Sequence, residues 1–311
     1  MFKKFIPLAT VALFALVTPA LAKDLNSIGA TFGSMGNPFF VQMAKGAEAK
    51  AKEIGGPNVT VMTVSADYDL NKQSTQIDNF VASGVDMVLV NAADPNAIEP
   101  AMARLHAAGI VSVAVDVSAK GADATVQTNN IEAGEMACQY ISDKLKGKGN
   151  VIIINGPPVS SIVDRVNGCK QVLAKSPGIK ILSDNQNGKG SREGGLEVMI
   201  GLLTAFDKVD AVFSVADQQA IGADLAAKQL NRTGFFITSV DGAPDIEVAL
   251  KQPGSLIEAS AAQDPYAMVQ KAVEVGNAIL QGKPPAEKTI LIPAQLITRN
   301  NVTEYKGWTA K

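Results

Sequence analysis

The chain has 311 residues, of which 47% are hydrophobic and 19% are charged, and its formal net charge is −2 at pH 7. This slightly acidic balance argues against a nucleic-acid partner, because nucleic-acid binding needs a basic face. The single histidine excludes a multi-histidine metal site and a histidine-based acid–base pair. We therefore expect neither a metal nor a cofactor.

Residues 1–22 have the pattern of a secretory signal peptide. Lys3 and Lys4 form a basic start, an apolar run follows from Phe5 to Val17, and Ala20-Leu21-Ala22 is a small-residue cleavage site. Cleavage near Ala22 removes 22 of the 311 residues and leaves 289, with 26 basic and 30 acidic side chains. No apolar run is long enough to span a bilayer comfortably. Export with a single predicted cleavage indicates a periplasmic protein.

Short β-branched runs alternate with amphipathic stretches along the mature chain. The predicted strands are Ser27–Phe32, Val59–Val64, Met87–Asn91, Val111–Asp116, Ala124–Thr128, Val151–Asn155, Ile179–Ser183, Ala211–Val215, Phe235–Val240, Leu256–Ala262 and Thr289–Ile292. Helical patterns between them include Ala97–Ala108, Ala133–Leu145, Gly194–Phe206, Gln219–Leu230 and Tyr266–Gln281. This alternation indicates an α/β fold with parallel sheets covered on both faces. There are too many strands for one ordinary sheet, so we expect two Rossmann-like lobes, with the first hinge near Asn129.

The stretch from Gly33 to Phe40 reads as a loop that leads into a helix. Asn37 is the expected N-cap and Pro38 the first helical residue. Phe39 and Phe40 follow in the first turn, and two interpretations stay open for them. They either form an apolar wall for a ligand, beside the Asn37 amide, or pack in the core beneath the sheet.

Polar residues recur close to the ends of the predicted strands. They are Asn37, Asn91 and Asp116 in the first half of the chain and Arg165, Asp241 and Gln263 in the second half. Ligands of open α/β sheets bind outside the carboxyl ends of the strands. Six polar residues at equivalent positions in two lobes therefore predict a cleft lined with groups that bind hydroxyls.

Three other features have ordinary structural interpretations. Asp67-Tyr68-Asp69-Leu70-Asn71 opens like a calcium loop, but Lys72 stands where such a loop needs glycine, so we expect a loop with Asn71 as helix cap. Gly188-Lys189-Gly190-Ser191 lacks the glycine spacing of a phosphate loop, so we expect a turn before a helix capped by Ser191. Cys138 and Cys169 either pair, as an oxidising compartment permits, or remain buried thiols.

Two other classes of function are weighed against binding. Asp116 and Asp241 could be paired catalytic carboxylates of a carbohydrate-processing enzyme. A carboxylate that accepts two hydroxyl hydrogen bonds explains the same residues without chemistry. A sugar-responsive gene regulator would carry an N-terminal helix-turn-helix where this chain has its signal peptide.

The sequence resembles the ribose-type group of periplasmic sugar-binding proteins, the soluble receptors of ABC importers. The resemblance covers essentially the whole mature chain. Its marks are Asn37-Pro38-Phe39-Phe40, Asn91 in Val-Leu-Val-Asn, Asp116 in Val-Ala-Val-Asp, Thr128-Asn129-Asn130, Asp241-Gly242 with Pro244, and Gln263.

The resemblance implies two similar lobes that are joined by three crossovers and close on a sugar. The crossovers are expected near Thr128–Asn130, Ala262–Asp264 and Pro293–Ala294. The N-terminal lobe then comprises residues 23–128 and 264–292, and the C-terminal lobe comprises 129–263 and 293–311.

The matched positions imply a set of ligand-binding residues and no catalytic ones. The set is Asn37, Phe39, Phe40, Asn91, Asp116, Asn129, Arg165, Asp241 and Gln263. The two phenylalanines would pack on the sugar and the others would bind hydroxyls, with Arg165 bonding hydroxyls or orienting Asp241 or Asp116.

Three departures from the ribose pattern affect the expected ligand. Val117 stands in place of an arginine, Ala216 in place of an asparagine, and Gly190 in place of an aromatic residue. The resemblance with these departures implies that ribose is not the best ligand. We expect a linear polyol, a deoxy or substituted sugar, or a bulkier sugar. The expected protein partner is a membrane permease, with a chemoreceptor as an alternative, and we expect a monomer.

Overall fold

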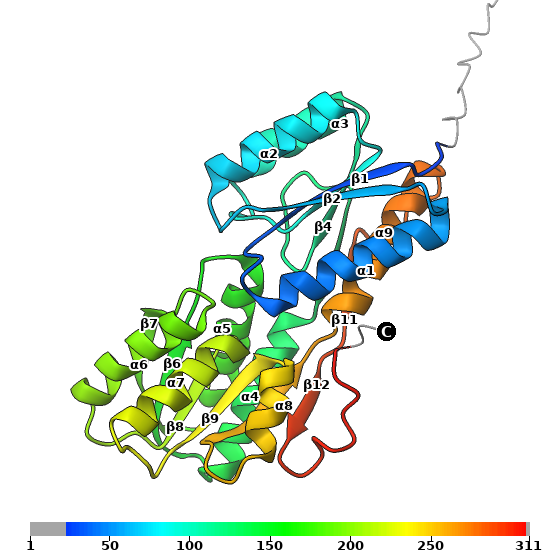
Figure 1. Cartoon of the computed structure of the whole chain (residues 1–311). Coiled ribbons are helices and arrows are strands. Elements are labelled where there is room, and N and C mark those ends of the chain that lie inside the picture. The colour runs from blue at the N-terminus through cyan, green and yellow to red at the C-terminus, as the bar shows by residue number, and fades with distance from the viewer. Residues whose placement is uncertain (1–22, 309–311) are drawn as a thin grey trace, which may run out of the picture.

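A computed structural model describes residues 23–308, and its strands form two six-stranded sheets (Figure 1). The predicted signal peptide lies outside the described residues. The first sheet contains β1 (Ser27–Phe32), β2 (Thr60–Ser65), β3 (Met87–Val90), β4 (Val111–Val115), β5 (Ala124–Thr128) and β11 (Thr289–Ile292). The second contains β6 (Lys148–Asn155), β7 (Gly178–Asn187), β8 (Ala211–Ser214), β9 (Phe236–Asp241), β10 (Ile257–Ala262) and β12 (Gln295–Thr298).

The two sheets repeat one topology. Their strand orders are β11-β5-β4-β3-β1-β2 and β12-β10-β9-β8-β6-β7, which match strand by strand. The pairs are parallel except for β12 with β10. This arrangement confirms the predicted α/β fold of two Rossmann-like lobes, and β4 and β9 occupy equivalent places in it.

Helices cover both faces of each sheet. In the first lobe α1 (Pro38–Gly55) packs with α9 (Pro265–Leu280), and α2 (Leu70–Ser83) packs with α3 (Glu99–Ala107). In the second lobe α4 (Asn130–Lys144) packs with α5 (Ser160–Leu173), while α6 (Arg192–Ala205), α7 (Asp217–Gln229) and α8 (Pro244–Lys251) pack together. The side chains from Val151 to Ile154 in β6 are fully buried, as expected for strands covered on both faces.

The predicted helix caps are partly confirmed. Asn37 caps α1 by accepting a hydrogen bond from Phe39 N at 3.0 Å, with Pro38 at the first position, and Ser191 caps α6. The prediction for α2 was wrong, because its cap is Asp69 rather than Asn71. The Asp69 carboxylate accepts from Lys72 N at 2.9 Å, and Asn71 already lies inside the helix.

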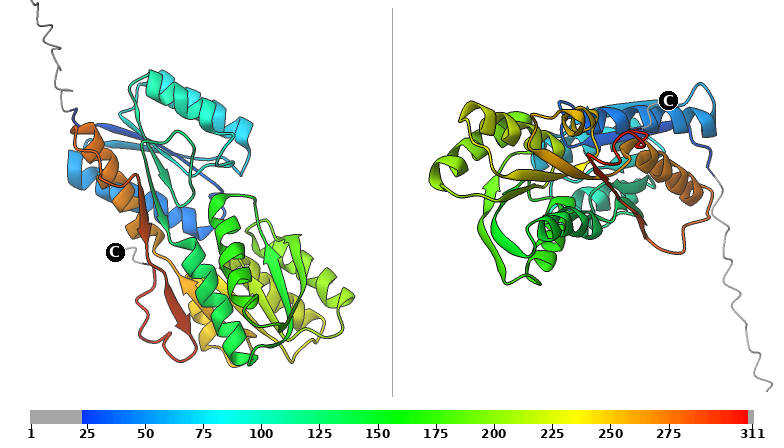
Figure 2. Two further views of the ribbon diagram at one scale, coloured as in Figure 1. Left: turned by 180° about the vertical axis from the view of Figure 1, so that it is seen from behind. Right: turned by 90° about the horizontal axis from the view of Figure 1, so that it is seen from below.

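The main chain passes between the sheets three times. β5 in the first sheet leads into α4, which packs on β9 and β10; β10 leads back to α9, which packs on β4 and β5. The third passage joins β11 to β12, and the chain then returns to the junction between the lobes (Figure 2). Sequence analysis missed β12, because it is a four-residue edge strand that carries polar residues at both ends.

The two cysteines form a disulfide within the second lobe. Cys138 in α4 is bonded to Cys169 in α5, and both side chains are fully buried. The close approach of these helices also requires small residues, because a Cβ on Gly134 would lie 2.0 Å from the Arg165 carbonyl oxygen. The disulfide therefore fixes the helix pair that carries Arg165.

No helix in the described part of the chain is both long and apolar enough to cross a bilayer. This finding agrees with the hydropathy of the sequence.

Removal of the disulfide should weaken the second lobe. The cysteines are 31 residues apart, and a closed loop of that length stabilises a folded protein by about 3–4 kcal/mol through the entropy of the unfolded chain. We expect Cys138→Ala with Cys169→Ala to lower the free energy of unfolding in urea by that amount. An unchanged urea midpoint would show that the cross-link contributes nothing to stability.

Candidate functional site

A cavity lies between the two lobes where the carboxyl ends of their strands face each other. The lining residues are Asn37, Phe39, Phe40, Tyr68, Asn91, Asp116, Val117, Pro157, Val159, Ser161, Ile162, Arg165, Gly190, Ala216, Asp241 and Gln263. They come from both lobes and from the second crossover.

The structure brings eight of the nine predicted site residues together around this cavity. Asn129 is not among the residues that line the cavity, and its side chain caps α4 by accepting from Glu132 N. Arg165 lines the cavity but does not lie at a strand end, since it projects from the interior of α5. Tyr68 was not predicted as a site residue, because its loop was examined only as a possible calcium site and was interpreted as an ordinary loop before a helix.

Asp116 brings a carboxylate into the cavity from the end of β4. Its Oδ2 accepts a hydrogen bond from Asn91 Nδ2 at 2.9 Å, and the same amide donates to the Val115 carbonyl at 3.2 Å. Asp116 is only 6% exposed, yet Oδ1 has no hydrogen-bond partner among residues 23–308. Its φ of 68° is uncommon for a residue other than glycine, and such backbone strain is typical of functional sites.

Burial raises the pKa of Asp116 from 3.8 to about 6. Arg165 acts in the opposite direction and the Asp241 charge adds to the increase. The Arg165 charge therefore offsets only part of the effect of burial on the pKa of Asp116. A ligand hydroxyl that donates to Oδ1 would supply the missing interaction.

Asp241 occupies the equivalent position at the end of β9, but its carboxylate is fully engaged. Oδ1 accepts from Arg165 NH1 at 3.0 Å and from Gln263 Nε2 at 2.7 Å, and Oδ2 accepts from Asp217 N at 3.3 Å. Its φ of 136° is also unusual for a residue with a side chain. Burial raises the pKa of Asp241, while Arg165 and Gln263 act to lower it.

Arg165 is held rigidly, which suits it to orient Asp241. Its Nε donates to Asn130 Oδ1 at 2.9 Å, and NH1 also donates to the Val215 carbonyl at 2.8 Å. Only 3% of the residue is exposed. Of the two roles predicted for Arg165, the orientation of Asp241 is observed directly.

Gln263 links the site to two of the crossovers. Its Oε1 accepts from Thr128 Oγ1 at 2.6 Å, while its Nε2 donates to Asp241. Thr128 ends the last strand before the first crossover, and Gln263 follows β10 at the second. The hinge and the Asp241 carboxylate therefore belong to one hydrogen-bond network.

Three aromatic rings form one wall of the cavity. Phe39 and Phe40 are edge-to-face at 5.4 Å, and Phe40 meets Tyr68 edge-to-face at 6.4 Å. Both phenylalanines are almost completely buried, so they serve as core residues and as cavity wall at once. Gly33 leaves room for these rings, because a Cβ there would lie 2.8 Å from both Phe40 and Tyr68.

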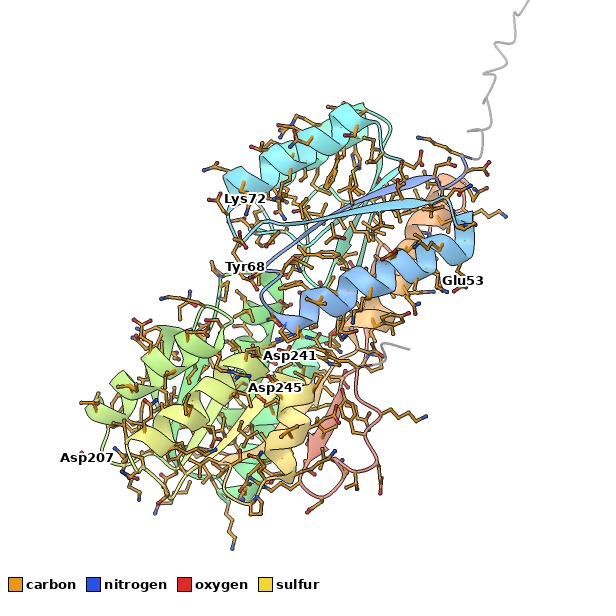
Figure 3. All side chains as sticks on the ribbon, in the orientation of Figure 1. Glu53, Tyr68, Lys72, Asp207, Asp241 and Asp245 are labelled. Carbon is orange, nitrogen blue, oxygen red and sulfur yellow. A yellow bond between two sulfur atoms is a disulfide. The ribbon has the colours of Figure 1, made fainter. Side chains whose placement is uncertain are left out.

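Tyr68 faces the position where the ribose pattern has an aromatic residue in the other lobe. Its hydroxyl lies 3.6 Å from where a Cβ of Gly190 would be. Figure 3 shows Tyr68 and Asp241 on the facing sides of the lobe junction. Tyr68 therefore fills, from the first lobe, part of the space that Gly190 leaves in the second.

Trp308 supports the site from behind the cavity and was also missed by sequence analysis. Its Nε1 donates to the Asp241 carbonyl at 2.9 Å, and its ring meets Phe39 edge-to-face at 5.7 Å. Trp308 thus contacts one cavity residue of each lobe. No local sequence pattern marks this role, because it depends on the return of the chain from β12.

Asp217 stiffens the loop behind Asp241. It accepts from the hydroxyls of Ser239 and Ser260 and from Ala243 N, and it is fully buried. Burial and the Asp241 charge raise the pKa of Asp217 well above its ordinary value. It does not line the cavity, so its role is to position the Asp241–Ala243 turn.

The arrangement suits binding rather than chemistry. Fixed acceptors and donors face an enclosed space beside aromatic rings, which is how proteins hold hydroxylated molecules. Residues 23–308 contain no cluster of three or more His, Cys, Asp or Glu side chains that could hold a metal ion.

Comparisons with known proteins agree with this fold. A profile of the periplasmic binding protein domain matches residues 28–284. The ribose import binding protein RbsB of Bacillus subtilis is 32% identical over 93% of this chain and 97% of its own length. The xylitol-binding protein of Mycolicibacterium smegmatis is 31% identical over 91% of this chain and 80% of its own length.

Solved structures share the fold. An ABC transporter solute binding protein from Mycobacterium smegmatis with bound glycerol has a TM-score of 0.85 and 24% sequence identity. The match covers 92% of this chain and 100% of that protein.

The raised pKa of Asp116 predicts a pH dependence of stability. The folded protein holds the Asp116 proton more tightly than the unfolded chain, so this group favours folding below about pH 4 and loses that contribution as the pH rises to about 6. We expect Asp116→Asn to be more stable than the natural protein at pH 7 by roughly 1–3 kcal/mol, with the difference vanishing near pH 4.

Urea unfolding of both unliganded proteins between pH 4 and pH 7 measures this difference. The comparison cancels the titration of groups that do not interact with Asp116, whereas the interaction of the Asp116 and Asp241 charges is part of the measured difference. If the unfolding free energies of the two proteins change with pH in the same way, the Asp116 charge does not destabilise the folded protein, and the prediction is contradicted.

Proposed function

We propose that this chain, which belongs to the periplasmic binding protein family, captures a monosaccharide or sugar alcohol between its lobes and delivers it to an ABC importer. The family consists of solute-binding proteins and not of enzymes. The observation that carries the proposal is the buried Asp116 carboxylate, which lines an interlobe cavity beside an aromatic wall and whose Oδ1 has no partner among residues 23–308.

The proposed ligand contacts follow from the groups that the protein leaves available. Asp116 Oδ1 accepts from a hydroxyl, while Asn37 offers its amide N–H groups because its Oδ1 already caps α1. Arg165, Asp241 and Gln263 form a fixed polar surface on the opposite side. Phe39, Phe40 and Tyr68 cover the C–H surface of the ligand.

Ligand capture is proposed to be coupled to closure of the lobes. We assign residues 23–128 and 264–292 to one moving body and residues 129–263 and 293–308 to the other. A ligand that contacts both bodies binds the closed form more tightly than the open form, so it shifts the population toward closure. The permease can then distinguish loaded from empty receptor.

The cellular context is part of the proposal. The family and the signal-like N-terminus support a periplasmic location and a membrane permease as the partner. We propose a monomer, and a chemoreceptor is the second candidate partner. A sensory role would use the same ligand site.

A thermal-shift screen tests the proposed function directly. We expect at least one pentose, hexose, methyl sugar or polyol to stabilise the natural protein, by about 2.7 kcal/mol at one hundred times its dissociation constant. Asp116→Ala should abolish this shift, because it removes the free acceptor while keeping the fold.

The unliganded melting temperature of Asp116→Ala serves as the control. A large loss of unliganded stability would mean that Asp116 is a structural residue. The absence of a shift with every member of the panel would contradict the proposed function, and conversion of a sugar to a product would indicate an enzyme.

Ribose is not expected to be the tightest ligand. Val117, Ala216 and Gly190 replace two hydrogen-bonding residues and an aromatic residue of the ribose pattern, and all three line the cavity. Isothermal titration calorimetry with ribose, xylitol and other polyols checks this expectation. Tighter binding of ribose than of every other member would contradict it.

A further inference from the structure

The cavity lining combines polar and apolar residues. The polar groups are those of the Asp116 and Asp241 networks described above. Outside the aromatic wall the apolar residues are Val117, Pro157, Val159, Ile162 and Ala216, which we call the apolar side. Val117 is 1% exposed, Val159 4% and Ile162 7%, so these side chains belong to the interior of the protein.

The apolar side is built by both lobes together. Val117 follows β4 in the first lobe, whereas Val159 and Ile162 lie at the start of α5 in the second. Ser118 N donates to Ser160 Oγ at 2.8 Å, which holds these two segments against each other. Val117, Val159 and Ile162 accordingly belong to a single buried hydrophobic cluster.

This apolar side adjoins Asp116 through Val117. Asp116 and Val117 are consecutive, and Asp116 Oδ1 is unpartnered among the described residues. A ligand hydroxyl on Asp116 therefore brings the neighbouring part of the ligand toward Val117. A second hydroxyl that faced valine and isoleucine would be buried without a partner, which proteins disfavour strongly.

Ser161 is the one polar residue that interrupts the apolar side. A single hydroxyl can satisfy one ether or hydroxyl oxygen but cannot solvate a polar face. A methyl or methylene group, in contrast, gains favourable contacts with Val117, Val159 and Ile162.

We propose that the ligand is a sugar or polyol with a deoxy, methyl or O-methyl position that packs against the apolar side formed by Val117, Val159 and Ile162. This inference rests on the proposed function and narrows its ligand class. The polar network recognises hydroxyls at one end of the ligand, and the apolar side selects against an additional hydroxyl at the other.

Matched ligand pairs test the proposal by isothermal titration calorimetry. The pairs are L-fucose with L-galactose, L-rhamnose with L-mannose, and methyl ribopyranoside with ribose. One extra apolar group in a hydrophobic pocket changes affinity by about 10- to 200-fold. We expect the deoxy or methylated member of at least one pair to bind tenfold or more tightly than its hydroxylated partner.

Two substitutions of the same kind identify the apolar side as the source of the preference. Val117→Thr replaces a methyl group with a hydroxyl inside the cavity. In the ligand pair that shows the preference, it should reduce the ratio of the affinity for the deoxy or methylated member to the affinity for its hydroxylated partner about tenfold. Val163→Thr makes the same change on α5 next to Ile162, but Val163 is 46% exposed, so the ratio should not change. If Val117→Thr does not fold, Val159→Thr replaces it and the same reduction is expected.

The outcomes separate this inference from the proposed function. Binding of these sugars without a preference for the deoxy or methylated member overturns the inference and leaves the proposed function intact. An unchanged ratio in Val117→Thr also overturns it. Failure of the natural protein to bind any sugar or polyol overturns both.

Discussion

The buried carboxylate of Asp241 is the interaction on which the geometry of the site depends. Its atoms accept hydrogen bonds from α5 through Arg165, from the second crossover through Gln263, and from the start of α7 through the backbone. A buried charge that loses its partner is strongly destabilising. Helix α5, the second crossover and the start of α7 must therefore keep fixed positions around Asp241. Trp308 links this arrangement to the first lobe, because it donates to the Asp241 carbonyl and packs against Phe39.

The two lobes use equivalent aspartates in opposite ways. Asp241 is paired with Arg165, and both of its carboxylate oxygens accept hydrogen bonds from the protein, whereas Asp116 Oδ1 has no partner among residues 23–308. The second lobe thus presents a preformed polar surface, and the first keeps an acceptor that a ligand hydroxyl can engage. This division explains how a repeated fold can produce a site that is polar yet incomplete without its ligand.

Local patterns in the sequence predicted all the described strands except β12, the Asn37 cap and six polar residues around the cavity, because strand ends in parallel sheets meet at one edge. The same patterns left the role of Phe39 and Phe40 open, and only the resemblance placed them in the site. Asn129 lies at a crossover and caps a helix, and Asp69 rather than Asn71 caps α2. Tyr68 and Trp308 reach the site through a loop and a returning C-terminal segment, which no periodicity reveals.

The central claim is that a hydroxylated ligand completes the Asp116 network between the lobes. A crystal structure with the tightest sugar or polyol tests it most directly. The account predicts a ligand oxygen within hydrogen-bond distance of Asp116 Oδ1, with the ligand enclosed by both lobes against Phe39 and Phe40. A ligand bound outside this cavity, or one that leaves Asp116 Oδ1 without a partner, would contradict it.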